Sequence, residues 1–347
     1  MEKTANESRN AVDKTGAKYT KQILPPLVGS TFLKSPKVTV DELGPNNIAV
    51  VGVPYEGTKV SRLGCKHGPT AIREASFMFS YLLQSLEEAA LVDPVTEEVI
   101  RQSDRYDVVD VGDLALYQAD VHETSRLIRE GIAAIVKTGA FPMILGGDHY
   151  TSYPCLEGVL AGLKAAGRDE VFGYAHIDSH LDLADTMPFF GKLSSGTQVR
   201  RMIDTAGVDP HNMLMIGIGG IQPKAEWDFA KRSGINMVLR HELLAAPSIY
   251  DLVSERLKCL SHCTAVYLTI DIDVNDRTYA PGVGNAVGAG GIFPLQFLEV
   301  LAALRQLPLV AVDLVEVAPN IDHSGRTASL AVTALTTVLE DKLFDRE

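Results

Sequence analysis

The chain has 347 residues, 46% of them hydrophobic and 22% charged, so it is long enough to bury a large core. Its 32 lysines and arginines are outnumbered by 44 aspartates and glutamates, which gives a formal net charge of −12. An acidic chain without basic tracts is poorly suited to bind nucleic acid or an anionic membrane. No apolar stretch resembles a signal peptide or is long enough to span a bilayer, so we expect a cytoplasmic protein.

Residues 1–45 are polar and are expected to form an N-terminal arm before a single catalytic domain at residues 46–347. Short apolar, β-branched runs predict strands, in chain order, at residues 48–53, 106–111, 142–145, 171–177, 213–218, 235–239, 265–272 and 309–317. Apolar residues at helical spacing lie between most of these runs, at residues 71–86, 121–136, 225–233, 252–260 and 295–304. Apolar strands that alternate with helices predict a three-layer α/β/α domain with a central parallel sheet of about eight strands. A (β/α)8 barrel shows the same alternation of strands and helices, so this pattern does not exclude it.

Acidic and imidazole residues follow four of these predicted strands. The strand at 142–145 leads to Asp148-His149, and the strand at 171–177 leads to Asp178-Ser179-His180-Leu181-Asp182. The strand at 265–270 leads to Asp271-Ile272-Asp273, and the last strand leads to Asp313 and Glu316. Sites in open parallel sheets form outside the carboxyl ends of the strands. Because residues two apart in an extended chain point the same way, Asp178, His180 and Asp182 should converge, as should Asp271 and Asp273.

The charged side chains of such a cluster repel one another and lose solvation, which is unfavourable unless a cation balances their charge. Four aspartates carry four negative charges, which two divalent ions neutralise, and an added hydroxide leaves a negative excess that suits a cationic substrate. Mixed imidazole and carboxylate ligands favour Mn²⁺, Ni²⁺, zinc or iron over calcium or magnesium. Each motif alone is common by chance, but together they predict a two-metal hydrolase with six ligands: His149, Asp178, His180, Asp182, Asp271 and Asp273.

The same segments resemble a known family. LGGDHYTSYP, HIDSHLDLAD and LTIDIDVNDRTYAPGVG are similar to the three metal-site signatures of the ureohydrolase (arginase and agmatinase) superfamily, and the agmatinase-like branch is the nearer one. VVGVPYEGTKVSRLGCKHGPTAIREAS and DLVEVAPNIDHSGRTASLA resemble its first and last blocks, so the likeness runs from about residue 45 to the end. The resemblance implies an arginase-like fold, a guanidino substrate, urea or a substituted urea as product, and a homo-oligomer, either a trimer or a hexamer.

The resemblance also implies a role for each site residue. One metal ion would be held by His149, Asp178, Asp182 and Asp271, and the second by His180, Asp178, Asp271 and Asp273. Glu316 would receive the guanidinium group, and Asp148 would support a ligand histidine. Our own mechanistic hypothesis, apart from the resemblance, is that Asp182 takes a proton from the attacking hydroxide and passes it to the departing amine.

Four positions depart from the family pattern. Ser195-Gly196-Thr197-Gln198 stands where agmatinase-like relatives have His-Gly-Thr-Pro, so Ser195 replaces a histidine beside the substrate. Tyr150 replaces a serine, Gly219 an arginine and Arg277 a proline. Because all six ligands are present, this pattern predicts intact chemistry on an unusual substrate.

Three alternatives remain for the function. The substrate is agmatine or guanidinobutyrate, or it is a small or substituted guanidine (free guanidine, or a biguanide such as metformin) in a nickel-dependent reaction. An alternative of another class is a non-catalytic structural subunit of a hetero-oligomeric ureohydrolase. A one-metal zinc deacetylase of related fold is disfavoured because it lacks the second aspartate of the Asp-x-Asp pair.

Overall fold

The computed structural model describes residues 30–59, 61–84, 90–92, 97–285 and 290–346. Most of the predicted N-terminal arm, residues 1–29, lies outside these ranges. In its remainder Phe32 and Leu33 are buried, and the backbone N–H of Leu33 donates a hydrogen bond to Ser76 of the first helix, at 2.8 Å. The division of the chain into an arm and a catalytic domain stays a prediction.

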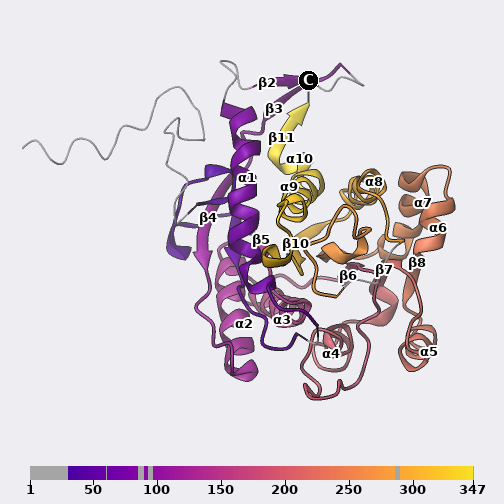
Figure 1. The fold of residues 1–347 in the computed structure, drawn as a ribbon. Helices are drawn as coiled ribbons and strands as arrows, with labels where there is room; N and C mark the ends of the chain where they lie inside the picture. Colours follow the sequence, from indigo (N-terminus) through magenta and orange to yellow (C-terminus); the bar gives the residue numbers. More distant parts are fainter. Residues whose placement is uncertain (1–29, 60, 85–89, 93–96, 286–289, 347) are drawn as a thin grey trace, which may run out of the picture.

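A sheet of eight strands forms the centre of the molecule (Figure 1). Its strands are β1 (Asn47–Gly52), β4 (Asp107–Asp113), β5 (Phe141–Leu145), β6 (Phe172–Ile177), β7 (Met213–Ile218), β8 (Asn236–Leu239), β9 (Ala265–Asp271) and β10 (Leu309–Val315). They lie in the order β4-β1-β5-β10-β9-β6-β7-β8, and every neighbouring pair is parallel. The sheet is open, with β4 and β8 at its edges, which excludes the barrel.

Helices cover both faces of this sheet, so the predicted three-layer α/β/α fold is confirmed (Figure 1). One layer consists of α1 (Gly68–Gln84), α9 (Arg326–Val338), α8 (Pro294–Leu304) and α7 (Ile249–Arg256), which pack in that order, with α6 (Arg240–Ala245) beside α7. The opposite layer consists of α2 (Val121–Lys137), α3 (Ser152–Ala165), α4 (Gln198–Asp204) and α5 (Lys224–Ser233).

The central strands are mostly apolar because they are buried on both faces. In β9, for example, Val266, Leu268 and Ile270 belong to the core under α1, α8 and α9. The alternate residues Ala265 and Tyr267 belong to the core under α2 and α3. Such strands have little room for charged side chains along their length, so these gather at the strand ends.

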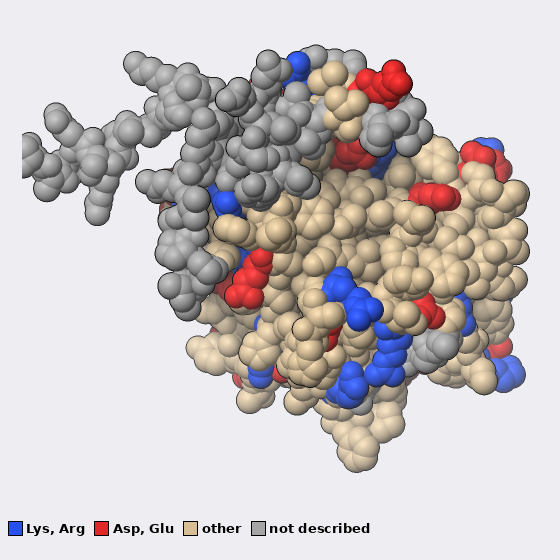
Figure 2. All heavy atoms as spheres, turned by 45° about the horizontal axis from the view of Figure 1, so that its top comes forward, with Lys and Arg blue, Asp and Glu red and all other residues tan. Residues whose placement is uncertain are grey.

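A second, antiparallel sheet was not predicted. It pairs β2 (Ala90–Val92), β3 (Val99–Gln102) and β11 (Phe344–Arg346), and it lies beside α10 (Glu340–Leu343), away from the large sheet (Figure 1). On the face drawn in Figure 2, acidic and basic side chains form separate small groups on a mostly uncharged surface. None of the described helices is both long and apolar enough to cross a membrane.

Candidate active site

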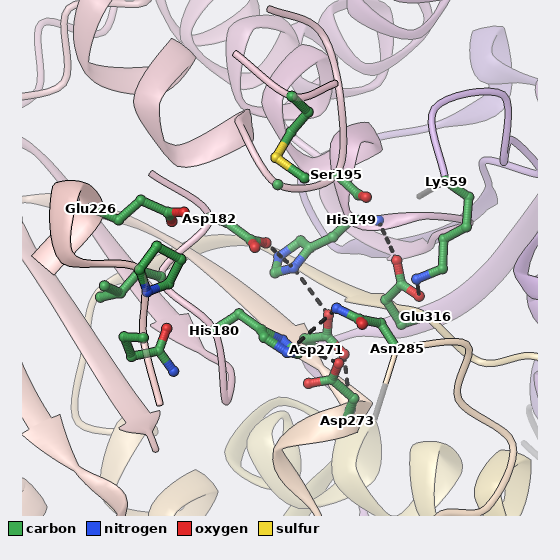
Figure 3. A pocket seen from close by; sticks show the side chains of 15 residues that line it. Lys59, His149, His180, Asp182, Ser195, Glu226, Asp271, Asp273, Asn285 and Glu316 are labelled. Carbon is green, nitrogen blue, oxygen red and sulfur yellow. Dashed lines mark hydrogen bonds and ion pairs between the residues drawn. The ribbon is translucent and has the colours of Figure 1, made fainter. Parts of the chain in front are cut away.

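The predicted site residues come from four strands that are neighbours at the centre of the sheet, in the order β5-β10-β9-β6. His149 begins a 3₁₀ turn shortly after β5, and Asp178, His180 and Asp182 lie on the loop after β6. Asp271 ends β9, Asp273 lies in the 3₁₀ turn Ile272–Val274, and Glu316 follows β10. Because parallel strands end at the same edge, these side chains meet in one place; Figure 3 shows His149, His180, Asp182, Asp271, Asp273 and Glu316 there.

A first cluster forms around His149. Its Nδ1 lies 3.0 Å from Asp178 Oδ2, 3.2 Å from Asp182 Oδ2 and 3.1 Å from Asp271 Oδ2. Two ligand atoms that bind one ion at about 2.1 Å and at right angles are about 3.0 Å apart, so these spacings suit a shared metal ion. Among the described residues, His149 Nδ1 and Asp178 Oδ2 are buried atoms without a hydrogen-bond partner. Buried polar atoms rarely stay unsatisfied, and a cation between them would satisfy both.

A second cluster forms around His180. Its Nδ1 lies 3.2 Å from Asp178 Oδ1 and 3.3 Å from Asp273 Oδ2. Asp178 therefore reaches His149 through one carboxylate oxygen and His180 through the other. This arrangement fits the predicted role of Asp178 as a bridge between two metal positions.

Local hydrogen bonds, rather than strand geometry, aim these side chains. Strand β6 ends at Ile177, and Asp182 has a left-handed backbone with φ of 50°. The backbone N–H of His180 donates to Asp178 Oδ1 at 2.7 Å, and that of Asp273 donates to Asp271 Oδ1 at 2.8 Å. Strand alternation thus predicts correctly which side chains lie close together. The chain that carries them is nevertheless not extended, because a loop follows β6 and a 3₁₀ turn follows β9.

The far side of the His149 ring is held by β9 and β10. Its Nε2 lies 3.2 Å from Thr269 Oγ1, and the Thr269 hydroxyl also hydrogen-bonds Asp313. A proton on Nε2 donated to Thr269 leaves the Nδ1 lone pair free to face the first cluster. Asp313, which the sequence places at the end of the last strand, lies within β10 and is buried, and burial raises the pKa of its carboxyl group.

Asp148 holds two loops of the site together. Its Oδ2 accepts hydrogen bonds from the backbone N–H and the hydroxyl of Thr58, at 3.1 and 2.9 Å. These bonds hold the loop after β1 against the loop after β5, and the support of a ligand histidine by Asp148 stays a prediction. Burial, and then the charge of Glu316, raise the pKa of Asp148 to about 7.

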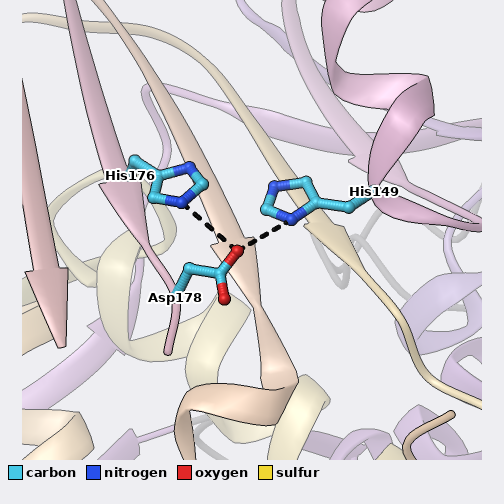
Figure 4. Close-up of side chains that lie close together, drawn as sticks. All are labelled: His149, His176 and Asp178. Atoms are coloured by element: carbon cyan, nitrogen blue, oxygen red, sulfur yellow. Dashed lines mark ion pairs between the residues drawn. The ribbon is translucent and has the colours of Figure 1, made fainter. Parts of the chain in front are cut away.

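Sequence reasoning missed His176, which lies beneath the first cluster (Figure 4). Its Nε2 is 3.2 Å from Asp178 Oδ2, its Nδ1 is 3.1 Å from the hydroxyl of Tyr174, and its ring stacks on His149 with centroids 5.1 Å apart. Because Nε2 lies 3.4 Å from the backbone carbonyl oxygen of His180 and Nδ1 faces a hydroxyl, we place the proton on Nε2, where it is donated to that carbonyl beside Asp178. The two-residue spacing of positions 178, 180 and 182, extended one step back, reaches His176.

The charges of the site are unbalanced in the protein alone. Burial opposes ionisation of Asp178, but the neighbouring His149, His176 and His180 outweigh it and hold the pKa of Asp178 well below its usual range. Burial and repulsion from Asp273 and Asp178 raise the pKa of Asp271 well above its usual range. The histidines therefore stabilise the charged form of Asp178, whereas the charged form of Asp271 needs a further cation nearby.

Glu316 has a buried partner that the sequence did not reveal. Its Oε1 accepts the backbone N–H of His149 at 2.9 Å, and its Oε2 forms an ion pair with Lys59. Both side chains are 2% exposed. The charge of Glu316 overcomes burial and raises the pKa of Lys59. Like Asp182, Glu316 has a positive φ, here 72°, a strained conformation that is common at functional sites.

A cavity opens over the two clusters. Among the described residues it is lined by Lys59, His149, His180, Leu181, Asp182, Met187, Ser195, Gly196, Gln222, Pro223, Glu226, Asp271, Asp273, Asn285 and Glu316. Of the four departures from the family pattern, only Ser195 lines it. Tyr150 is buried against α2, where its hydroxyl lies 2.7 Å from Ser125 Oγ, and Arg277 is exposed.

Comparison with known proteins identifies the family. Residues 46–340 match the arginase family. The chain is 30% identical over 315 residues to guanidinopropionase from Pseudomonas aeruginosa, covering 89% of this chain and 90% of that one. It is 33% identical over 292 residues to mitochondrial agmatinase from Gallus gallus, covering 84% and 79%. The solved structure of proclavaminate amidino hydrolase from Streptomyces clavuligerus superposes with a TM-score of 0.77 at 27% identity, covering 92% of this chain and 99% of that one. The chain thus belongs to the arginase family, and it is a metal-dependent hydrolase of the agmatinase-like ureohydrolases.

Proposed function

We propose that this chain hydrolyses the C–N bond of a guanidino compound to urea, or a substituted urea, and an amine, with two divalent ions per chain. One ion would be held by His149, Asp178, Asp182 and Asp271, and the other by His180, Asp178, Asp271 and Asp273. The observation that carries this proposal is the position of Asp178, whose two carboxylate oxygens face the two histidines at 3.0 and 3.2 Å. Such ions, when bound, lower the pKa of coordinated water towards neutrality.

The remaining groups bind the substrate and move its proton. Glu316 accepts hydrogen bonds from the guanidinium, since its carboxylate lines the cavity beside His149. Asp182 lies in the first cluster and also lines the cavity, so it takes the proton of the attacking water and passes it to the departing amine. Ser195 stands at the substrate side, where a hydroxyl can hydrogen-bond the departing nitrogen.

The substrate is agmatine, guanidinobutyrate, free guanidine or a biguanide, and the metal is Mn²⁺ or Ni²⁺, since imidazole and carboxylate ligands accept both. Relatives named guanidinopropionase, guanidinobutyrase and agmatinase support a guanidino substrate.

We also propose a homo-oligomer, either a trimer or a hexamer. In its support, Phe189 and Ile221 are fully exposed apolar side chains close in sequence to Met187 and Gln222, which line the cavity. A neighbouring subunit would cover them. Light scattering of the purified chain tests this proposal, and a monomer at micromolar concentration would contradict it.

A urea and ammonia release screen tests the function. The purified chain, loaded separately with Mn²⁺ and Ni²⁺, should release urea from at least one of agmatine, guanidinobutyrate, guanidinopropionate and guanidine, or a substituted urea from metformin. Glu316→Gln should weaken turnover, whereas Glu255→Gln, a surface change at an exposed ion pair with Lys258, should not. If the loaded chain releases no product alone but does so with a second subunit, it is the non-catalytic member of a hetero-oligomer.

A further inference from the structure

The two ends of the cavity are lined by different groups. At one end lie the metal clusters and the Lys59–Glu316 ion pair, and at the other lies Glu226 of α5, on the far side of Asp182 from His149 (Figure 3). A guanidino group held at Glu316 would leave the rest of the substrate to extend along this cavity. The side chains around that remainder then decide which substrates fit.

Glu226 offers an unoccupied acceptor there. Its Oε2 accepts the backbone N–H of Leu183 at 3.0 Å, which fixes the side chain in the first turn of α5. Its Oε1 has no hydrogen-bond or ion-pair partner among the described residues. The half-buried carboxylate therefore has one oxygen available to a ligand in the cavity.

Gln222 also presents an acceptor. Its Nε2 donates to the backbone carbonyl oxygens of Ser179 and Gly219, at 2.9 and 2.5 Å. With both amide hydrogens engaged, only its carbonyl oxygen remains for a ligand. Glu226 and Gln222 together make this end of the cavity rich in acceptors.

No basic side chain is free to balance them within the part of the chain that the structure describes. Lys59 is the one lysine or arginine that lines the cavity there, and its ammonium group is paired with Glu316. His149 and His180 face the metal clusters. Residues 286–289, next to the cavity residue Asn285, are Ala, Val, Gly and Ala in sequence and carry no charge.

We propose that Glu226 is the specificity-determining residue of this cavity, and that it selects guanidino substrates whose second end carries hydrogen-bond donors. This inference rests on the proposed function. An ammonium group, as in agmatine, or the second amidine of a biguanide would donate to Glu226 Oε1 and to the Gln222 carbonyl. The carboxylate of guanidinobutyrate or guanidinopropionate would meet a like charge and no free cation, and such a juxtaposition is unfavourable.

Matched substrates test the inference. Agmatine and 4-guanidinobutyrate differ at the distal group, an ammonium against a carboxylate. The metal-loaded wild type should bind agmatine at least about tenfold more tightly, the factor expected from one charged hydrogen bond. Glu226→Gln should reduce this preference by about tenfold, and Glu226→Lys should reverse it. Calorimetric Kd values are measured beside kcat/KM, and Asp228→Asn, which removes an exposed ion pair on the same helix, should leave the preference unchanged.

The two readouts separate this inference from the proposed function. Preferential binding of agmatine without product release would contradict the function and support the selective role of Glu226. Tighter binding of guanidinobutyrate, binding of neither compound, or a preference unmoved in Glu226→Gln would overturn the inference. So would a kcat/KM for free guanidine above that for agmatine and for metformin, since guanidine has no second end.

Discussion

The two ends of the cavity are built in different ways. At the metal end, Asp178 and Asp271 are buried, follow central strands and are each fixed by a backbone N–H from two residues further along the chain. At the other end, Glu226 and Gln222 are held by α5 and by the loop before it, outside the central strands. The ends of packed strands restrict the reacting groups, whereas loops are free to vary. This difference explains how one reaction is combined with different substrates.

The largest effect is expected at the bridging aspartate. Asp178→Ala removes the side chain that contacts both histidines, so both metal positions should be lost and product release should fall to background. The metal content of the dialysed variant, measured by mass spectrometry, checks this. If the variant retained one ion per chain, the two metal positions would be independent of each other. That result would contradict the proposed role of Asp178 as a bridge between them.

The next effect is expected on stability. Lys59→Met leaves Glu316 buried without its partner and should lower the free energy of unfolding by about 3–5 kcal/mol. The double variant Lys59→Met/Glu316→Gln should recover most of this loss, because no buried charge remains. Chemical denaturation of the metal-free proteins measures both. A single variant as stable as the wild type would mean that Lys59 does not compensate Glu316.

A smaller effect is expected behind the first cluster. Thr269→Val removes the hydroxyl between His149 and Asp313, so the ring loses the bond that orients it. Affinity for the divalent ion should fall by about 10–100-fold. Competition with a chelator measures the affinity, and Thr264→Val, which alters an exposed threonine just before the same strand, serves as control. Equal affinities of Thr269→Val and the wild type would exclude this orienting role.

The smallest effect is a pH dependence at the other end. Burial raises the pKa of Glu226 to about 7, so its carboxyl is protonated below that pH and charged above it. The kcat/KM for agmatine, divided by that for free guanidine, should therefore rise severalfold between about pH 6 and pH 8. The ratio removes steps common to both substrates. If the ratio rises equally in Glu226→Gln, the group that titrates is not Glu226, and the prediction is wrong.

The sequence predicts the metal end better than the substrate end for a physical reason. Apolar strands produce a strong local pattern, and the polar residues that end them stand out, as His149 and Asp271 do. Lys59 gives no such signal, because its pairing with Glu316 joins positions 257 residues apart. The β3–β11 pairing is invisible for the same reason, since it joins residues near 100 to the end of the chain.

Glu226 illustrates a further limit. In the sequence it looks like any solvent-facing glutamate in the first turn of a helix. Nothing in the sequence indicates that α5 lies beside the loop after β6. The bond from the backbone of Leu183 turns it towards the cavity. A tertiary contact of this kind becomes visible only when the helix and the loop are seen together.

A metal titration tests the central claim most directly. The metal-free chain is given increasing equivalents of Mn²⁺ or Ni²⁺, and bound metal and product release are measured on the same samples with the best substrate of the screen. Two occupied positions joined by Asp178 predict that release rises until two ions are bound per chain and then stays constant. Release that saturates at one ion, or that persists in a chelator, would contradict it.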